Sequence, residues 1–368
     1  MAQSLRGSVA YDRKLPWGLL ATGEALVSRG LSDFMFVNLN LRGPQAEDRF
    51  GRVLYGTIGA NGVPAPALRA GRFSEVIDLR NTGRNYSQQL SARVERRLAG
   101  GVGGSVSYTH SRVRDVQSPS RVNSPGIILW ADARATSGRH EDAARGISLN
   151  DIPHRATAAL AYAAPWLRRA TTFAFYYVGE SGGPFTYLAT GVNRRGDLNA
   201  DGSNANDPIY VPRDARDPAE MLFLPFSVPA AGPGASTGTV TVEQQADAFE
   251  QRIERTPCLR IQRGRILERN SCREPWSHTT IASVRHTVPV GTRAVEAQLE
   301  VSNVLNLLSG RWGRYRVADP RILEHVGQTT GAAGATQPIF RFDATRPDWT
   351  TVQAESAFQL QLALRYRF

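Results

Sequence analysis

The residues Phe358-Gln-Leu-Gln-Leu-Ala-Leu-Arg-Tyr-Arg-Phe368 form the stretch that decides the fold. Large apolar side chains occupy every second position, and Gln, Ala or Arg fills the positions between them. Side chains of a β-strand point alternately to opposite faces, so this pattern predicts one apolar and one polar face. A tilted strand of about 9–11 residues crosses a bilayer. This length and the aromatic residues at both ends favour a membrane-spanning strand over a strand of a soluble sandwich.

The same alternation recurs in pairs of segments that are joined by short turns, which indicates β-hairpins. One turn contains Gly100-Gly101, a second Pro165-Trp166, and a third the residues Pro289-Val-Gly-Thr292. The pattern predicts about nine strands in all. Their expected ranges are 5–14, 18–40, 73–98, 101–116, 148–164, 170–190, 276–288, 293–308 and 355–368.

The connections between these segments alternate in length. Turns near residues 16, 100, 167 and 290 are short, whereas about thirty residues or more form each of the segments 42–72, 117–147, 191–275 and 309–354. Long loops at every second connection are unusual in a compact soluble domain. They are typical of outer-membrane barrels, whose short turns face the periplasm and whose long loops face outside. We therefore expect an all-β protein, a partial transmembrane antiparallel β-barrel in the cell outer membrane.

Composition excludes several other classes of protein. No apolar run approaches the roughly 18 residues of a transmembrane helix. The net charge is +11, but Lys14 is the sole lysine and the arginines are scattered among acidic residues, so we expect no nucleic-acid binding. The first residues lack the apolar core of a secretory signal peptide. Either the protein stays inside the cell, or this chain lacks its true beginning.

The segment Gly196-Asp-Leu-Asn-Ala-Asp-Gly202 has the spacing of a calcium-binding loop. Asp197, Asn199 and Asp201 would offer oxygen ligands to one cation. A proline holds the twelfth position, where a bidentate Glu is usual, and Asp207 is the expected substitute. A solvated turn rich in Asn and Asp explains the same residues, so both interpretations stay open.

Two further features lie in the segment 191–275. Cys258 and Cys272 are the only cysteines. They form either a disulfide, which would imply an oxidising compartment, or two free thiols. We favour the disulfide. Thr241 and Gln244 are spaced for a capping box. Apolar residues at helical spacing follow and predict a short amphipathic helix that packs the loop. These residues are Val242, Ala246, Phe249 and Ile253.

Motifs follow one another in a defined order over residues 148–368. They are Asn150-Asp-Ile-Pro-His-Arg155, Gly179-Glu-Ser-Gly-Gly-Pro-Phe-Thr-Tyr187, the stretch 196–212, Pro257-Cys-Leu-Arg with Arg269-Asn-Ser-Cys-Arg273, and Val301-Ser-Asn-Val-Leu-Asn-Leu-Leu308 with Arg311-Trp-Gly313. In this order they resemble the Oar-like TonB-dependent outer-membrane receptors, including a loop of that group with two cysteines. The terminal Tyr366 and Phe368 resemble the signal by which barrels are recognised for assembly. Residues 1–147 match in pattern alone.

This resemblance implies a barrel of roughly 22 strands around an amino-terminal plug, preceded by a TonB-binding segment. We therefore expect residues 1–368 to be the carboxy-terminal part of such a barrel, without the plug domain or signal peptide. The expected partners are outer-membrane lipid, the barrel-assembly machinery, and the missing plug and strands. The TonB complex would be reached through the plug alone. Unpaired sheet edges are costly in lipid, so the chain is not expected to transport by itself.

The predicted function is the barrel portion of a receptor that takes up an unidentified ligand. The alternative is an adhesin-like surface module that binds through its outer loops. We expect no enzymatic activity, because H-E-x-x-H and G-x-S-x-G motifs are absent from the sequence, and no cofactor other than a structural calcium ion. The histidines form no close metal pair in the sequence. They are His110, His140, His154, His278, His286 and His325.

Overall fold

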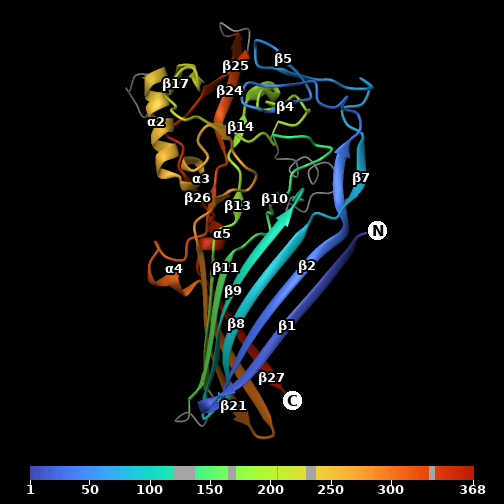
Figure 1. Cartoon of the computed structure of the whole chain (residues 1–368). Helices are drawn as coiled ribbons and strands as arrows, with labels where there is room; N and C mark the ends of the chain where they lie inside the picture. Colours follow the sequence, from blue (N-terminus) through green and yellow to red (C-terminus); the bar gives the residue numbers. More distant parts are fainter. Residues whose placement is uncertain (119–136, 165–170, 205, 229–237, 331–335) are drawn as a thin grey trace.

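The computed structural model describes residues 1–118, 137–164, 171–204, 206–228, 238–330 and 336–368. The predicted turn near residue 167 lies outside these ranges. Figure 1 shows long strands that run together from tight turns at one end to a cluster of loops at the other. No described helix is long and apolar enough to cross a membrane. The all-β prediction is confirmed.

The main sheet of the described residues has eleven strands, and nine of them follow one antiparallel path. The path begins and ends at β1 and β27, which are not paired with each other. Its strands, in order, are β1 (Gln3–Leu15), β2 (Leu19–Asn38), β8 (Tyr86–Ala99), β9 (Val102–Asp115), β11 (His154–Ala163), β12 (Thr171–Glu180), β21 (Ser277–Val290), β22 (Arg293–Ser302) and β27 (Gln359–Arg367). Beside the path, β7 (Ile77–Thr82) pairs with β2, and β10 (Gly146–Ile147) pairs with β9.

Several predicted strands are shorter than expected, for local reasons. The predicted strand 73–98 is divided into β7 and β8, because the side chain of Asn85 bonds to Asp33 and to the Val116 amide. The predicted strand 170–190 is shorter in the structure, where β12 ends at Glu180. A Cβ atom at Gly182 would lie 1.8 Å from the Glu274 carbonyl, so this close approach requires glycine. Asn303 adopts φ 54° and ends β22 before the short helix α4 (Val304–Leu308).

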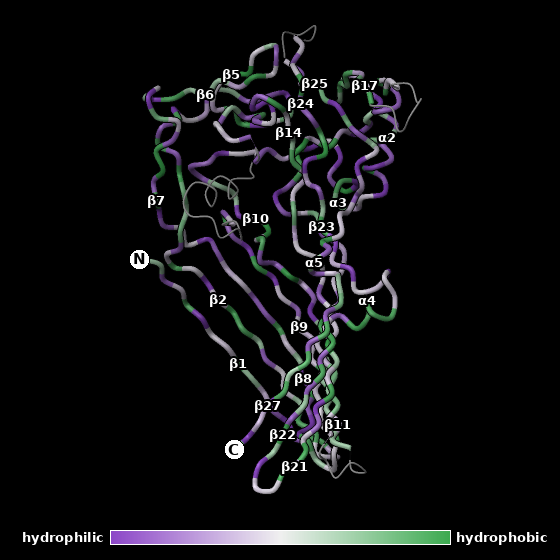
Figure 2. The backbone as a smooth tube through the Cα atoms, turned by 180° about the vertical axis from the view of Figure 1, so that it is seen from behind, coloured by the Kyte–Doolittle hydropathy of each residue, from purple (hydrophilic) through white to green (hydrophobic). Residues whose placement is uncertain are grey.

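The register of the main sheet places apolar side chains from neighbouring strands on one continuous face. Val106 faces Val94 and Ala158, and Leu299 faces Val284 and Leu362. Figure 2 shows the alternation of hydrophobic and hydrophilic residues along these strands. We call this surface the apolar face. It contains Val9, Ala25, Leu90, Val94, Val106, Leu160, Phe175, Val284, Leu299 and Leu362.

The opposite face of the same strands is polar. It contains Glu24, Ser91, Arg93, Ser105, Ser107, Thr157, Ser283, Glu300 and Gln361. Near the tight turns, Glu296 forms ion pairs with Arg285, Arg365 and Arg367 at 3.8, 3.6 and 2.7 Å. One face is thus suited to hydrocarbon and the other to water or to polar protein.

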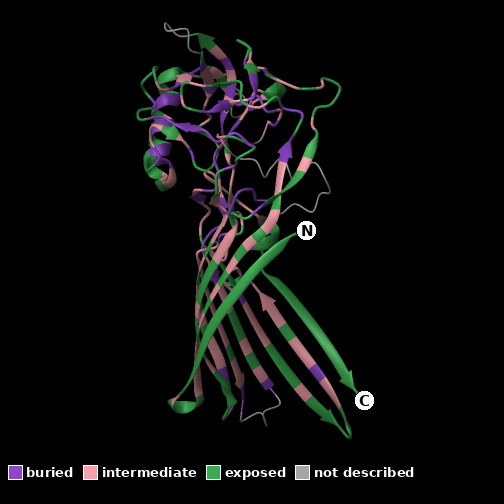
Figure 3. Cartoon of the chain, turned by 45° about the vertical axis from the view of Figure 1, so that its right-hand side comes forward, coloured by how far each residue is buried: buried purple, intermediate pink, exposed green. Residues whose placement is uncertain are grey.

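Most buried residues lie in the loops, as Figure 3 shows. We call the described parts of 39–75, 137–147, 184–275 and 309–352 the loop head. Its four-stranded sheet contains β14 (Leu188–Thr190), β24 (Arg321–Thr330), β25 (Thr336–Arg341) and β16 (Leu222–Phe223). Its two-stranded pairs are β3 (Ala46–Glu47) with β4 (Val53–Leu54), β5 (Gly56–Ile58) with β6 (Pro64–Pro66), β13 (Pro184–Phe185) with β20 (Cys272–Arg273), β15 (Tyr210–Val211) with β19 (Arg265–Ile266), β17 (Phe226–Val228) with β18 (Gly238–Val240), and β23 (Arg316–Ala318) with β26 (Trp349–Thr351). The long loops therefore form a folded unit with its own core.

The predicted amphipathic helix is α2 (Val242–Arg255), and it begins with the expected capping box. The Gln244 amide donates to Thr241 Oγ1, and the Thr241 amide donates to Gln244 Oε1. Ala246, Phe249 and Ile253 are buried in the core of the head, whereas Val242 is exposed. The other short helices are α3 (Pro257–Arg260), α5 (Gln353–Ser356), η1 (Pro16–Gly18) and η4 (Val192–Arg194).

Cys258 and Cys272 form a disulfide that ties α3 to β20. The bridge closes a loop with a sequence separation of 14 residues, which corresponds to a stabilisation of about 3 kcal/mol. We expect the C258S/C272S double variant to lose about this free energy of unfolding in urea titrations of the head. Reductant should destabilise the parent protein to the same extent and leave the double variant unchanged. An unfolding curve of the parent that does not respond to reductant would contradict this.

Candidate functional site in the loop head

The four predicted calcium ligands are buried in the loop between η4 and β15. The exposed fractions of Asp197, Asn199, Asp201 and Asp207 do not exceed 1%. A solvated turn would leave these side chains exposed, so the burial contradicts that alternative. Gly202 has φ +99°, so the bend after Asp201 requires the glycine that the sequence supplies.

Asp197, Asn199 and Asp201 hold the loop through backbone hydrogen bonds. The Asp201 amide donates to Asp197 Oδ1 at 3.0 Å and to Asn199 Oδ1 at 2.9 Å. The Gly202 amide donates to Asp197 Oδ2 at 2.9 Å, and the Ser203 amide donates to Asp201 Oδ1 at 2.7 Å. The side-chain oxygens of these three residues therefore converge on one short stretch of backbone.

Asp207 accepts hydrogen bonds from a different set of donors. Its Oδ1 accepts a hydrogen bond from Arg52 Nη1 at 3.0 Å, and its Oδ2 accepts one from the Leu198 amide at 3.1 Å. Arg52 is 2% exposed and also donates to the carbonyl of Pro208. Asp207 was predicted to replace the missing Glu as a calcium ligand. In the structure its carboxylate forms a buried ion pair with Arg52.

We call residues 196–207 the acidic loop, and burial changes the pKa values of its carboxyl groups. Loss of hydration raises the pKa of Asp197 to about 9, and the neighbouring charges of Asp201 and Asp207 add to the rise. Burial also raises the pKa of Asp207, whereas the Arg52 guanidinium holds it down. Within the described residues, no group of three or more His, Cys, Asp or Glu side chains could hold a metal ion.

Two distant segments close around the acidic loop, and sequence reasoning missed both. The Tyr55 amide donates to the Asn199 carbonyl at 2.7 Å, and the Tyr55 ring stacks on His140 with centroids 4.4 Å apart. His140 Nε2 lies 3.4 Å from Asp201 Oδ2. Arg52, Tyr55 and His140 belong to no local motif, so no sequence signal pointed to them.

A cavity of about 250 Å³ lies beside the acidic loop. Three loops contribute to it, and Phe50 and Tyr210 form a stacked pair in its wall with centroids 3.9 Å apart. Arg52 and Leu198 link it to the acidic loop. The other apolar lining residues are Ala46, Leu54, Ile58, Met221, Pro338 and Phe340. Asp48, Thr57, Glu220, Gln328 and Thr336 also line it, so the cavity suits an apolar group that carries some polar atoms.

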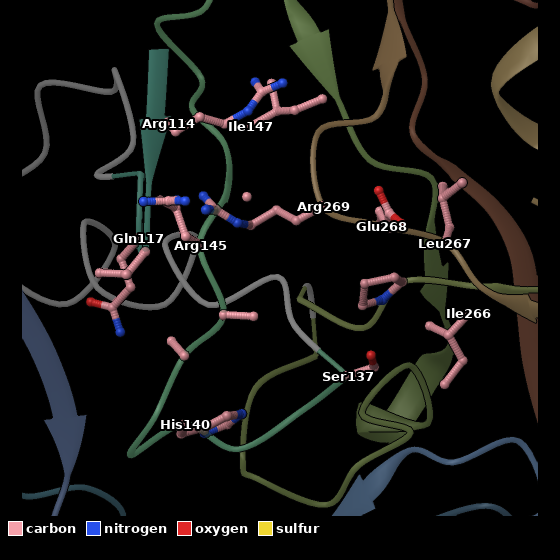
Figure 4. A pocket seen from close by; sticks show the side chains of 15 residues that line it. Arg114, Gln117, Ser137, His140, Arg145, Ile147, Ile266, Leu267, Glu268 and Arg269 are labelled. Carbon is pink, nitrogen blue, oxygen red and sulfur yellow. The ribbon is translucent and has the colours of Figure 1, made fainter. Parts of the chain in front are cut away.

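A second cavity of about 440 Å³ lies between the end of β9 and residues 266–269, and Figure 4 shows its lining. Three arginines line it, and each has a partner. Arg269 pairs with Asp115 at 2.8 Å, Arg114 with Asp151 at 3.6 Å, and the Arg145 guanidinium lies 4.9 Å from the centre of the Tyr86 ring. The contacts of Arg269 and Arg145 join the head to β9 and β8 of the main sheet.

Residues 4–310 match the family described as outer membrane beta barrel domain. The chain belongs to this family. Its location is the outer membrane, as the sequence predicts. No curated protein matches the chain. Among solved structures it is similar to the outer membrane transporter YddB from Escherichia coli, with a TM-score of 0.43 and 7% identity over 99% of this chain. The chain spans 32% of the length of that chain.

Aromatic and histidine side chains of this barrel-family protein gather on the apolar face where the strands approach the head. Tyr108 Oη lies 2.6 Å from His154 Nδ1, and Tyr177 Oη lies 2.9 Å from His278 Nδ1. Trp276 stacks between the two histidines. Such rings are typical of the aromatic girdle at a membrane interface.

The predicted assembly residues lie at the opposite end of the apolar face. Tyr366 shares that face with Leu362, and Arg293 Nη1 donates to its hydroxyl at 2.8 Å. The rings of Tyr366 and Phe368 are 6.4 Å apart, and both side chains are exposed. Recognition of these two residues by the assembly machinery stays a prediction.

We expect the stability of the loop head to depend on pH through His325. Its ring is fully buried, with Nδ1 2.6 Å from the Arg195 carbonyl oxygen, and burial lowers its pKa below the ordinary 6.5. The unfolded chain therefore binds the proton more tightly, and the stability contributed by neutral His325 is lost as pH falls below 6.5. We expect H325Q to flatten the decrease in the free energy of unfolding below pH 6.5, and H110Q to preserve it. Equal pH slopes in the parent and H325Q would contradict this.

Proposed function

We propose that the chain is the barrel portion of a TonB-dependent receptor of the Oar-like group, which takes up a ligand captured by the loop head. The observation that carries this proposal is the division of the main sheet into an apolar and a polar face, with a folded head at one end and tight turns at the other. The apolar face would contact lipid, and the polar face would line the lumen. The head would face outside, and the tight turns would face the periplasm.

The two outer strands of the main sheet each have one unpaired edge, which indicates that further strands pair with them. Within the described sheet, β1 pairs with β2 alone and β27 pairs with β22 alone. Each unpaired backbone group in hydrocarbon costs several kcal/mol, and only a closed barrel avoids this cost. We propose that strands outside residues 1–368 pair with both edges and complete a barrel of roughly 22 strands.

The polar face would surround a plug, and the loop head would make the first contact with ligand. Arg285, Arg365 and Arg367 around Glu296 leave the turn end of this face positively charged, which suits an acidic surface of a plug. In the head, the cavity beside Phe50 and Tyr210 would receive an apolar part of the ligand.

Binding of the purified periplasmic domain of TonB tests the proposal. We expect residues 1–368 alone, refolded in detergent micelles, to show no binding, because TonB would be reached through the plug. Co-expression with the plug and the additional strands should give an assembly that binds it. Binding to residues 1–368 alone, or none to the plug-bearing assembly, would contradict the receptor function. The latter result would favour an adhesin-like module.

A further inference from the structure

The larger cavity, between the end of β9 and residues 266–269, brings three positive charges together. Arg114, Arg145 and Arg269 line it. Figure 4 shows the guanidinium ends of Arg145 and Arg269 pointing toward each other. Arg269 also lies against the backbone that follows Arg145, because a Cβ atom at Gly146 would lie 3.2 Å from Arg269 Nη2. Since like charges repel, such a wall attracts an anion.

Neighbouring carboxylates offset these charges in part. Asp115 neutralises Arg269, whose Nη1 lies 2.8 Å from its carboxylate. Asp151 lies 3.6 Å from Arg114 Nη1, but the same carboxylate also pairs with Arg273. Two carboxylates are thus shared among three arginines, and Arg114 holds the weaker share of Asp151.

Arg145 contributes a positive charge that no described carboxylate pairs with. Its guanidinium packs on the Tyr86 ring, 4.9 Å from the ring centre, and the residue is exposed. Glu268 is the single carboxylate among the described residues that line the cavity. It is 67% exposed and lies 3.7 Å from Arg265. The N–H donors of Arg145 are therefore available to a ligand that enters from solvent.

We propose that this cavity binds an organic anion, whose carboxylate or phosphate group is held by Arg114 and Arg145. The planar fork of a guanidinium matches both kinds of oxyanion with paired hydrogen bonds. The volume of about 440 Å³ falls within the roughly 300–1,000 Å³ of small-molecule sites, so it holds more than a lone inorganic ion. Ala143, Ile147 and Leu267 line it too and would contact the apolar part of the anion.

The anion would contact the main sheet and the head at the same time. Arg114 belongs to β9, whereas Arg145 directly precedes β10 and Arg269 follows β19 in the head. The inference names a ligand class for the receptor and so rests on the proposed function. Binding of the anion itself, however, requires neither TonB nor a plug, so the two are tested separately.

Calorimetry on residues 1–368, refolded in micelles of an uncharged detergent, tests the site with simple anions. The probes are phenyl phosphate, benzoate and dihexanoylphosphatidic acid, and benzyl alcohol is the neutral control. We expect saturable binding of one anion per chain and no saturable binding of benzyl alcohol. Tighter binding of the phosphatidic acid would assign the site to a lipid headgroup, and tighter binding of phenyl phosphate or benzoate would assign it to a soluble solute.

Substitutions of Arg145 test whether the guanidinium holds the anion. R145M should weaken binding at least roughly tenfold, as expected for the loss of a hydrogen bond between charged groups. R145K should weaken it less, because lysine keeps the charge but lacks the planar fork. R216M is the control, since it removes an exposed arginine of the head that pairs with Asp247 and does not line the cavity. It should bind as the parent does.

Three results would overturn the proposal. They are a parent protein that binds none of the three anions, equal binding of benzyl alcohol and phenyl phosphate, and unchanged affinity in R145M. Circular dichroism identifies a variant that fails to fold, and R145Q, which removes the same charge, then replaces R145M. If the plug-bearing assembly binds TonB while the chain binds no anion, the anion site is wrong and the receptor function stands.

Discussion

Replacing Arg52 with Met is expected to lower the free energy of unfolding of the loop head by about 3–5 kcal/mol. Arg52 is buried, and its guanidinium bonds to Asp207 at 3.0 Å and to the Pro208 carbonyl. Methionine fills similar volume but leaves the Asp207 carboxylate in the interior without its partner. Urea titration of the refolded chain, followed by fluorescence, measures the change.

A double-mutant cycle isolates this interaction from packing. The R52M/D207N protein should recover part of the loss, because the amide leaves no unpaired charge. R346M provides a matched control in the head, since Arg346 pairs with Asp319 at 3.2 Å at the surface and should contribute at most about 1 kcal/mol. Equal losses in R52M and R346M would show that the buried pair does not stabilise the head.

Replacing Val106 with Arg is expected to destabilise the membrane-inserted sheet by about 2–4 kcal/mol. Val106 lies in the middle of β9, between Val94 and Ala158, and is 63% exposed on the apolar face. An arginine there would bring its charge into hydrocarbon. Refolding of the assembly that contains the completing strands into lipid vesicles at graded urea concentrations measures the loss.

The neighbouring residue provides the control for this substitution. Ser105 lies on the polar face opposite Glu95, where an arginine meets a carboxylate and water. S105R should therefore change the free energy of insertion by less than about 1 kcal/mol. A loss in S105R as large as that in V106R would mean that the two faces of β9 meet the same environment.

The sequence predicted the membrane strands well, because their alternation is local. The pattern of Phe358 to Phe368 holds in β27, and the Gly100-Gly101 turn joins β8 to β9. Strand ends were less predictable. The division of β7 from β8 depends on hydrogen bonds of Asn85 to Asp33 in β2 and to Val116 just after β9, which the local sequence does not encode.

The sequence predicted the residues of the candidate site that follow a local motif, but not those that other loops contribute. Asp197, Asn199 and Asp201 follow a local spacing, and the capping box of α2 does so too. Arg52 and Tyr55 reach the same loop from the segment 42–72, so their roles depend on how the loops pack.

We expect the main sheet to lie in the outer membrane with its apolar face toward lipid. A nitroxide scan of residues 102–110 in lipid vesicles, one introduced cysteine at a time, tests it most directly. We expect collisions with oxygen to peak at positions 102, 106 and 108, and collisions with a water-soluble nickel chelate to peak at 105, 107 and 109. A scan without this two-residue period, or with both probes reaching the same positions, would contradict the account.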